Sequence, residues 1–396
     1  MQPKSNPAAS LPEPDPESAA HSRQVVRYIR DRIADQGGSI AFSEFMQHAL
    51  YAPGLGYYLS GSRKFGERGD FVTAPEISPL FGQVIARQAA PVLRASDGGR
   101  ILEIGAGSGE LAVAVLKKLA DLDALPQEYL ILEVSPELCH RQQELISSSV
   151  PDHAARVRWL AGLPDKFTGV IVANEVADAL PVERIARVDG RTLQARVACD
   201  REKFCWQWAE APPALIDAID AIENDLGHAL PDGYRSEVCL ALAPWVRDLV
   251  ACLRCGVLFA FDYGVTRREY YAPDRNGGWL RCHFRHHVHG DPLILAGIQD
   301  LTAWVDYSAM ARAAREAGGC IAGFVSQAHF LINGGLGDEL RGFDALDLER
   351  QVDLSRQAKL LTLPGEMGEH VKCLGVAAGD VRSPSAFREF DRSHTL

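Results

Sequence analysis

The apolar positions from about residue 100 onward fall into short runs that alternate with longer amphipathic stretches. The apolar runs are RILEIGAG, EYLILEV, VRWLAG and GVIVANE, and the helical stretches are ELAVAVLKKLADL and LCHRQQELI. Strands that alternate with helices in this way pair in parallel and are covered by helices on both faces of the sheet. The pattern therefore predicts an α/β fold with a Rossmann-like sheet.

The chain before this sheet has a different texture. Residues 1–20 are rich in Pro, Ser and Ala, and they predict a disordered tail. Residues 21–99 predict an N-terminal helical region, with helices at 21–37, 42–50 and 78–93. The stretch 57–70 is rich in glycine and charge, which indicates a surface loop.

The regular alternation stops after the fourth strand. The segment ERIARVDGRTLQARVACD alternates on both sides of Asp189-Gly190, which predicts a β-hairpin. We expect this hairpin to belong to an insertion at about 183–235. A helix over 236–253 then leads into a fifth buried strand, VLFAFDYG.

The rest of the chain predicts a lobe followed by late strands. Residues 265–299 show little periodicity, and a loop of that length in a compact domain is usually functional. Two strand patterns, CIAGFVSQ and KCLGVAAG, flank a helical stretch near 345–361. We therefore divide the chain into a cofactor-binding core at 100–264, a substrate lobe with a late strand at 265–335, and a C-terminal helix with the last strand at 336–396.

Composition narrows the classes of partner and compartment. The formal net charge is −11, and a protein that binds nucleic acid needs a basic surface, so nucleic acid is not expected. No apolar run is long enough to cross a bilayer. Nine scattered cysteines without framework spacing favour reduced thiols in a cytoplasm, and the acidic N-terminus differs from an Arg-rich presequence.

Two groups of residues have partial metal-site spacing. Cys252 and Cys255 form a CxxC pair at the end of a helical pattern. A His cluster lies beside Cys282, at His283, His286, His287 and His289. Neither group has a second ligand pair at metal spacing, so we predict no metal site.

The strongest motif is ILEIGAGSGEL, in which an acid precedes a glycine turn. Gly105, Gly107 and Gly109 would let the backbone turn tightly between strand and helix and approach a ligand closely. The acid Glu103 suits a ligand with positive charge, such as the ammonium and sulfonium of S-adenosylmethionine, better than a pyrophosphate. Glu133 ends the next strand, where an acid accepts hydrogen bonds from a ribose. A dinucleotide site and a merely close-packed turn are the alternatives.

The fourth strand ends in polar residues that need a partner. Asn174, Glu175 and Asp178 follow its apolar run, and ligands of open parallel sheets bind at the carboxyl ends of the strands. Asn174 could cap the next helix, but two nearby carboxylates favour a cationic substrate. We therefore predict that Glu175 and Asp178 face the substrate.

The segment GDFVTAPEISPLFG precedes the core and adds further candidates. Gly69 and Glu76 are candidates for cofactor binding, and Asp70 and Thr73 lie in the same segment. Ser78-Pro79 predicts a helix N-cap followed by proline in the first turn.

These motifs resemble the MidA-like family of class I methyltransferases, which includes the mitochondrial complex I assembly factor that methylates an arginine of a complex I subunit. The resemblance covers about 27–376. The segments that carry it are HALYAPGLGYY, GDFVTAPEISPLFG, LEIGAGSGELA, ANEVADALPVERI, FDYG and GIQDLTAWVDY.

The resemblance implies a seven-stranded sheet with an antiparallel last strand and inserted segments over the crevice. It implies cofactor contacts for Glu103, Gly105, Ala106, Gly107, Gly109, Glu133 and Val134, with Asn174 shared between cofactor and catalysis. It carries catalytic candidates over to Asn174, Glu175, Asp178 and His286. A late motif falls on Asp262, Tyr263, Gly264, Arg281, Asp300, Thr302 and Asp306, whereas Trp279 and Trp304 depart from the residues typical of related chains.

The sequence thus predicts direct methyl transfer from S-adenosylmethionine to a nucleophile, with an arginine of a protein substrate preferred. A complex I subunit is one candidate substrate, and a homodimer is compatible with the sequence. The acidic, Pro-rich N-terminus differs from the mitochondrial member of the family and favours a bacterial, cytoplasmic protein. A small-molecule methyltransferase, a non-catalytic assembly chaperone that binds the cofactor, and a dinucleotide-dependent oxidoreductase are the alternatives.

Overall fold

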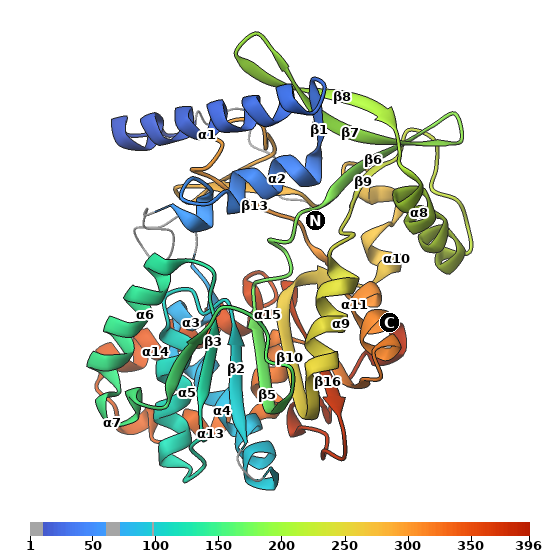
Figure 1. The fold of residues 1–396 in the computed structure, drawn as a ribbon. Coiled ribbons are helices and arrows are strands. Elements are labelled where there is room, and N and C mark those ends of the chain that lie inside the picture. The colour runs from blue at the N-terminus through green and yellow to red at the C-terminus, as the bar shows by residue number, and fades with distance from the viewer. Residues whose placement is uncertain (1–10, 61–71, 97–98) are drawn as a thin grey trace.

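A computed structural model describes residues 11–60, 72–96 and 99–396. Its main sheet confirms the Rossmann-like prediction (Figure 1). The strand order is β4 (Val157–Leu160), β3 (Tyr129–Leu132), β2 (Arg100–Ile104), β5 (Phe167–Asn174), β10 (Leu253–Val265), β16 (Val371–Ala378) and β15 (Cys320–Ser326). The first five strands are parallel, and β16 runs antiparallel to both of its neighbours, as predicted for the last strand. A short strand, β14 (Val305–Asp306), pairs with the end of β10.

Two apolar cores cover the two faces of this sheet. Successive residues of a strand point to opposite faces, so Ile101 of β2 belongs to one core and Leu102 to the other. The first core packs against α4 (Pro79–Ala95) and α5 (Glu110–Asp121), and the second packs against α9 (Leu242–Cys252) and α11 (Tyr307–Glu316). Burial on both faces explains why the strands read as almost continuous apolar runs.

A second, antiparallel sheet forms a separate lobe (Figure 1). The predicted hairpin is confirmed as β6 (Glu183–Val188) and β7 (Arg191–Asp200), which meet at Asp189-Gly190. The lobe also contains β1 (Ser39–Ala41), β8 (Lys203–Glu210), β9 (Arg235–Val238) and α8 (Pro213–Leu226).

The N-terminal region belongs to this same lobe. Its helices α1 (Pro16–Asp35) and α2 (Phe42–Tyr51) share a core with Val197 of β7 and Leu301. Because β1 pairs with β7, the N-terminal region and the insertion are one structural unit, although we treated them as separate segments.

Three predicted segments are wrong in detail. Helix α1 begins at Pro16, inside the predicted tail, because Asp15 accepts a hydrogen bond from the Ser18 N–H and caps the helix. The helix predicted from residue 236 begins at Leu242, since the preceding residues pair with β6 as β9. The predicted long loop contains α10 (Arg267–Tyr270), η2 (Pro273–Arg275), β11 (Arg281–Phe284) and β12 (His287–His289).

The remaining elements are short helices and a short strand in the main domain and the lobe, together with the longer helices α6 (Pro136–Ser149) and α14 (Leu348–Thr362). The short elements are η1 (Tyr57–Leu59), α3 (Ala74–Ile77), α7 (Pro151–Ala154), β13 (Asp300–Thr302), α12 (Gln327–Gly334), α13 (Leu336–Glu339), η3 (Phe343–Ala345), α15 (Met367–His370), η4 (Ser385–Phe387) and η5 (Ser393–Thr395). No helix in the described part of the chain combines the length and the apolar character that crossing a bilayer requires.

Candidate functional site

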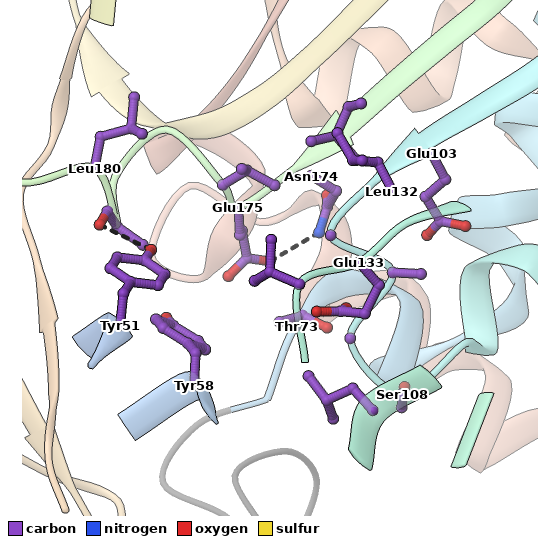
Figure 2. Close-up of a pocket in the computed structure, with 18 of the residues that line it drawn as sticks. Tyr51, Tyr58, Thr73, Glu103, Ser108, Leu132, Glu133, Asn174, Glu175 and Leu180 are labelled. Atoms are coloured by element: carbon purple, nitrogen blue, oxygen red, sulfur yellow. Dashed lines mark hydrogen bonds between the residues drawn. The ribbon is translucent and has the colours of Figure 1, made fainter. Parts of the chain in front are cut away.

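A cavity of about 510 Å³ lies at the carboxyl ends of β2, β3 and β5. Its wall combines the turn after β2, the loop after β5 and two tyrosines of the N-terminal region, Tyr51 and Tyr58 (Figure 2). The carboxyl edge of a parallel sheet is where ligands bind in such folds, because the connecting loops separate there. The cavity is therefore the candidate functional site.

The glycine turn forms one end of the cavity. Gly105, Gly107 and Gly109 all have positive φ, at 66°, 52° and 92°, a conformation that side chains with a Cβ rarely adopt. Gly105 and Gly107 line the cavity. Gly109 is the N-cap residue of α5, and a Cβ there would meet the Gln142 side chain at 3.3 Å. The first two glycines thus admit a ligand, and the third allows close packing.

Glu103 supplies a buried carboxyl group beside this turn. The residue is only 3% exposed, and its Oε2 accepts a hydrogen bond of 2.7 Å from the Tyr129 hydroxyl. Burial raises the pKa of Glu103 to about 7. A bound cation would favour the ionised form, so this group suits an ammonium.

Glu133 directly follows β3 and lines the same end of the cavity. Its Oε1 accepts from the Ser135 N–H at 2.9 Å, and its Oε2 accepts from Gln142 Nε2 at 3.1 Å. Gln142 also donates to the Gly107 carbonyl at 2.9 Å, so one side chain joins Glu133 to the glycine turn. These bonds fix the orientation of the carboxylate at the cavity wall.

The loop after β5 forms the other end of the cavity. Glu175 lines it and has a φ of 51°, and its N–H donates to the Phe261 carbonyl at 2.9 Å. Asn174 lines the cavity too, and its buried Oδ1 has no hydrogen-bond partner among the described residues. A buried acceptor without a donor is costly, so a ligand N–H or O–H is the expected partner.

Asp262 holds this loop in place. Its Oδ2 accepts the backbone N–H groups of Val176, Ala177 and Asp178 at 3.2, 2.8 and 3.2 Å. Its Oδ1 accepts the Tyr263 N–H at 2.9 Å. The resemblance placed Asp262 in a late motif without a definite role, and the geometry assigns it to positioning the loop that carries Glu175.

The carboxyl groups at this end lie close enough to affect one another. Burial, followed by the charge of Asp178, raises the pKa of Glu175 to about 8. Burial and the charges of Asp262 and Asp300 raise the pKa of Asp178 well above its usual range. Within the described ranges, Glu175, Asp178 and Asp262 form no ion pair. A bound cation would therefore favour the ionised forms of these carboxyl groups.

The structure separates the predicted site residues into two groups. Glu103, Gly105, Ala106, Gly107, Glu133, Val134, Asn174 and Glu175 line the cavity, whereas Asp178 is buried behind the wall. Glu76 turns back to accept the Thr73 N–H at 3.1 Å in a capping box, and Thr73 is the residue of that turn that lines the cavity. Ser78 caps α4, as predicted. Gly69 and Asp70 lie outside the described residues.

His286 does not reach the cavity. It lies beside Arg285 in the turn between β11 and β12, is exposed, and has a φ of 61°. The structure therefore shows His286 as a turn residue, with no contact to the cavity. Among the residues that the structure describes, no group of three or more His, Cys, Asp or Glu side chains is arranged to hold a metal ion.

Other residues of the late motif have structural partners. Asp306 caps α11 by accepting the Ala309 N–H at 3.0 Å, and it also pairs with Arg267 Nε at 2.9 Å. Trp279 and Trp304, the two departures from the family, stack on each other with ring centroids 4.2 Å apart. The two tryptophans thus form one packed contact in this chain.

Sequence reasoning missed Tyr51 and Tyr58 as site residues. Tyr58 falls in the predicted surface loop 57–70 and Tyr51 directly follows the predicted helix 42–50, yet both line the cavity. The available signal was the aromatic spacing in YAPGLGYY, since three tyrosines rarely lie so close together in an exposed loop.

Comparisons with known proteins give a consistent result. The family model for S-adenosyl-L-methionine-dependent methyltransferases matches residues 84–325. The chain is 25% identical to the protein arginine methyltransferase NDUFAF7, mitochondrial, of Danio rerio, over 91% of this chain and 88% of that protein. The Drosophila melanogaster homolog is 26% identical over 95% of this chain and 90% of its own length.

Solved structures agree with the sequence relatives. A crystal structure from Burkholderia thailandensis, bound to S-adenosyl-homocysteine, is 40% identical and has a TM-score of 0.92. The match covers 98% of this chain and 100% of that one. A second structure from the same organism is 41% identical, with a TM-score of 0.90.

The cavity fits S-adenosylmethionine on its own chemistry. Glu103 suits the ammonium, Glu133 suits the ribose hydroxyls, and Gly105 with Gly107 leaves room for close backbone contact. The dinucleotide alternative is wrong, because the family match identifies a different cofactor. The chain belongs to the MidA-like family of S-adenosyl-L-methionine-dependent methyltransferases.

Proposed function

We propose that this methyltransferase modifies a guanidinium nitrogen of an arginine in a protein substrate. The observation that carries the proposal is the Glu175 carboxyl group, which faces the cavity across from the glycine turn (Figure 2). Relatives over almost the whole chain are named protein arginine methyltransferases, which supports the same acceptor. A complex I subunit is the first acceptor to test, in line with the resemblance in the sequence.

The residues of the cavity would divide the work between its two ends. Glu103, Glu133 and the glycine turn would bind and orient the cofactor, which when bound supplies an activated methyl group on a sulfonium. Glu175 would hold the guanidinium by two parallel hydrogen bonds, a geometry that fixes the plane of the acceptor. Orientation of this kind is the main contribution an enzyme makes when the transferred group is already activated.

Glu175 would also receive a proton. A guanidinium nitrogen that gains a methyl group must lose a proton, and either carboxylate oxygen of Glu175 could accept it. A pKa near 8 places this group close to neutral pH, where general bases work best. Asp262 contributes indirectly by holding the backbone of residues 176–178, which directly follow Glu175, and so keeps Glu175 in place.

The test is transfer of labelled methyl groups from S-adenosylmethionine into a host lysate, followed by mass spectrometry. The parent protein should label arginine, and Glu175→Gln should bind S-adenosylhomocysteine but label at least about 100-fold more slowly, the usual effect of a general base. Label on another side chain or on a small molecule would refute arginine as the acceptor. Cofactor binding without any label would favour the assembly chaperone. Size-exclusion chromatography and cell fractionation would test the predicted homodimer and cytoplasmic location.

A further inference from the structure

Two stacked tyrosines form the wall of the cavity opposite the glycine turn. Tyr51 ends α2 and Tyr58 lies in η1, and their ring centroids are 5.4 Å apart with an interplanar angle of 21°. Both rings line the cavity (Figure 2). They come from the N-terminal region, so this region contributes directly to the site of the methyltransferase core.

The hydroxyl groups of both tyrosines are already committed to protein acceptors. Tyr51 donates to the Ala179 carbonyl at 3.1 Å, and Tyr58 donates to Asp300 Oδ1 at 2.9 Å. Asp300 is buried, and the same oxygen accepts the Leu301 N–H at 3.0 Å. The tyrosines therefore offer a ligand their rings and their oxygen lone pairs, but no hydrogen to donate.

The other groups at this end are also hydrogen-bond acceptors. Glu175 offers a carboxyl group, and Asn174 offers an Oδ1 that has no donor in the described part of the chain. A guanidinium carries five N–H donors and no acceptor, so it matches such a set. Its flat face can also stack on an aromatic ring, which a compact ammonium group does less well.

We propose that Tyr51 and Tyr58, together with Glu175 and Asn174, form an acceptor subsite that selects a planar guanidinium over an ammonium, with Asp300 as a positioning residue for Tyr58. The inference rests on the proposed function and extends it to the substrate-binding residues. The clustered carboxyl groups of Glu175 and Asp178 lack a cationic partner among the described residues and so favour a cation here, and the aromatic wall favours a flat one.

The experiment uses the full chain with S-adenosylhomocysteine bound and two small probes, methylguanidinium and methylammonium. By calorimetry, the parent should bind methylguanidinium about 10-fold more tightly than methylammonium. Tyr58→Leu should lose about 10-fold in methylguanidinium affinity, the range for a desolvated cation–aromatic contact, while its affinity for S-adenosylhomocysteine is unchanged.

Two further variants separate the ring from the hydroxyl group. Tyr58→Phe keeps the ring but releases Asp300, so it should bind methylguanidinium like the parent and lower kcat with an arginine peptide about 10-fold at unchanged KM. Tyr234→Phe is the matched control, because its hydroxyl donates to the Ala272 carbonyl at 3.2 Å in the other lobe, away from the cavity. It should match the parent in every measurement.

The outcomes distinguish the subsite from the proposed function. If Tyr58→Leu binds methylguanidinium like the parent, or if the parent binds both probes equally, the subsite is refuted. If the parent labels no arginine but its binding of methylguanidinium depends on Tyr58, the subsite stands and the proposed function fails. If Tyr58→Leu also loses affinity for S-adenosylhomocysteine, the test passes to Tyr51→Leu and Tyr58→Phe. The inference fails if Tyr51→Leu binds methylguanidinium like the parent and Tyr58→Phe has the kcat of the parent.

Discussion

Replacing Glu175 by Gln should stabilise the protein, and the gain should grow with pH. Burial and Asp178 raise the pKa of Glu175 from 4.5 to about 8, so the folded protein holds this proton more tightly than the unfolded chain does. Between these two values, unfolding releases the proton, and the free energy of unfolding falls as pH rises. Gln cannot titrate, keeps the shape of the side chain, and still offers an oxygen to the Ala74 N–H.

The magnitude follows from the two pKa values. At about 1.4 kcal/mol for each pH unit, a carboxyl group cut off from water would lose about 5 kcal/mol between pH 4.5 and pH 8. Glu175 is partly exposed to the cavity, where water screens its charge, so we expect about half of that. Between pH 6 and pH 8, the advantage of Glu175→Gln over the parent should therefore increase by about 1–2 kcal/mol.

Urea unfolding of both proteins at pH 6, 7, 8 and 9, followed by tryptophan fluorescence, would measure this difference. The matched control is Glu144→Gln, since Glu144 lies on the exposed face of α6 with a side chain that is 69% exposed. Its effect should be small at every pH. A Glu175→Gln advantage that is the same at pH 6 and pH 8 would show that Glu175 ionises like a surface carboxyl group, and the role as a base near neutral pH would fall with it.

Three further changes test the rest of the site. Gly107→Val should abolish binding of S-adenosylhomocysteine in calorimetry, because the φ of 52° at Gly107 and its place in the cavity wall exclude a branched side chain. Unchanged affinity in a folded variant would show that the glycine turn is not part of the site. Glu133→Ala should weaken S-adenosylhomocysteine by about 1.5–3 kcal/mol and an analogue without ribose hydroxyls much less, whereas equal losses would contradict the ribose assignment. The affinity for S-adenosylhomocysteine should rise with pH and level off above pH 7, because Glu103 loses its proton over this range. Glu103→Gln should flatten this dependence. If the affinity of the parent protein does not change with pH, Glu103 does not contact the ammonium.

The amino-acid sequence alone was enough to predict the parts of this protein that local chemistry specifies. Apolar runs that alternate with amphipathic stretches predicted the parallel sheet, because each strand and helix must bury its own apolar residues. Glu103, the glycine turn and Glu133 lie within two consecutive strand–helix units, so their spacing along the chain already describes their arrangement in space. Asp189-Gly190 likewise predicted its hairpin from turn chemistry.

Only the tertiary structure could decide which distant segments meet at the cavity. The Tyr58 hydroxyl bonds Asp300, which lies 242 positions later in the chain, and no local pattern encodes such a contact. The N-terminal region joins the inserted lobe through β1 and β7 for the same reason. The tertiary structure also places His286 in an exposed hairpin turn outside the cavity wall, which its motif did not indicate. Local spacing thus determines the cofactor end of the cavity, and long-range packing determines the acceptor end, since that end is assembled from three separate parts of the chain.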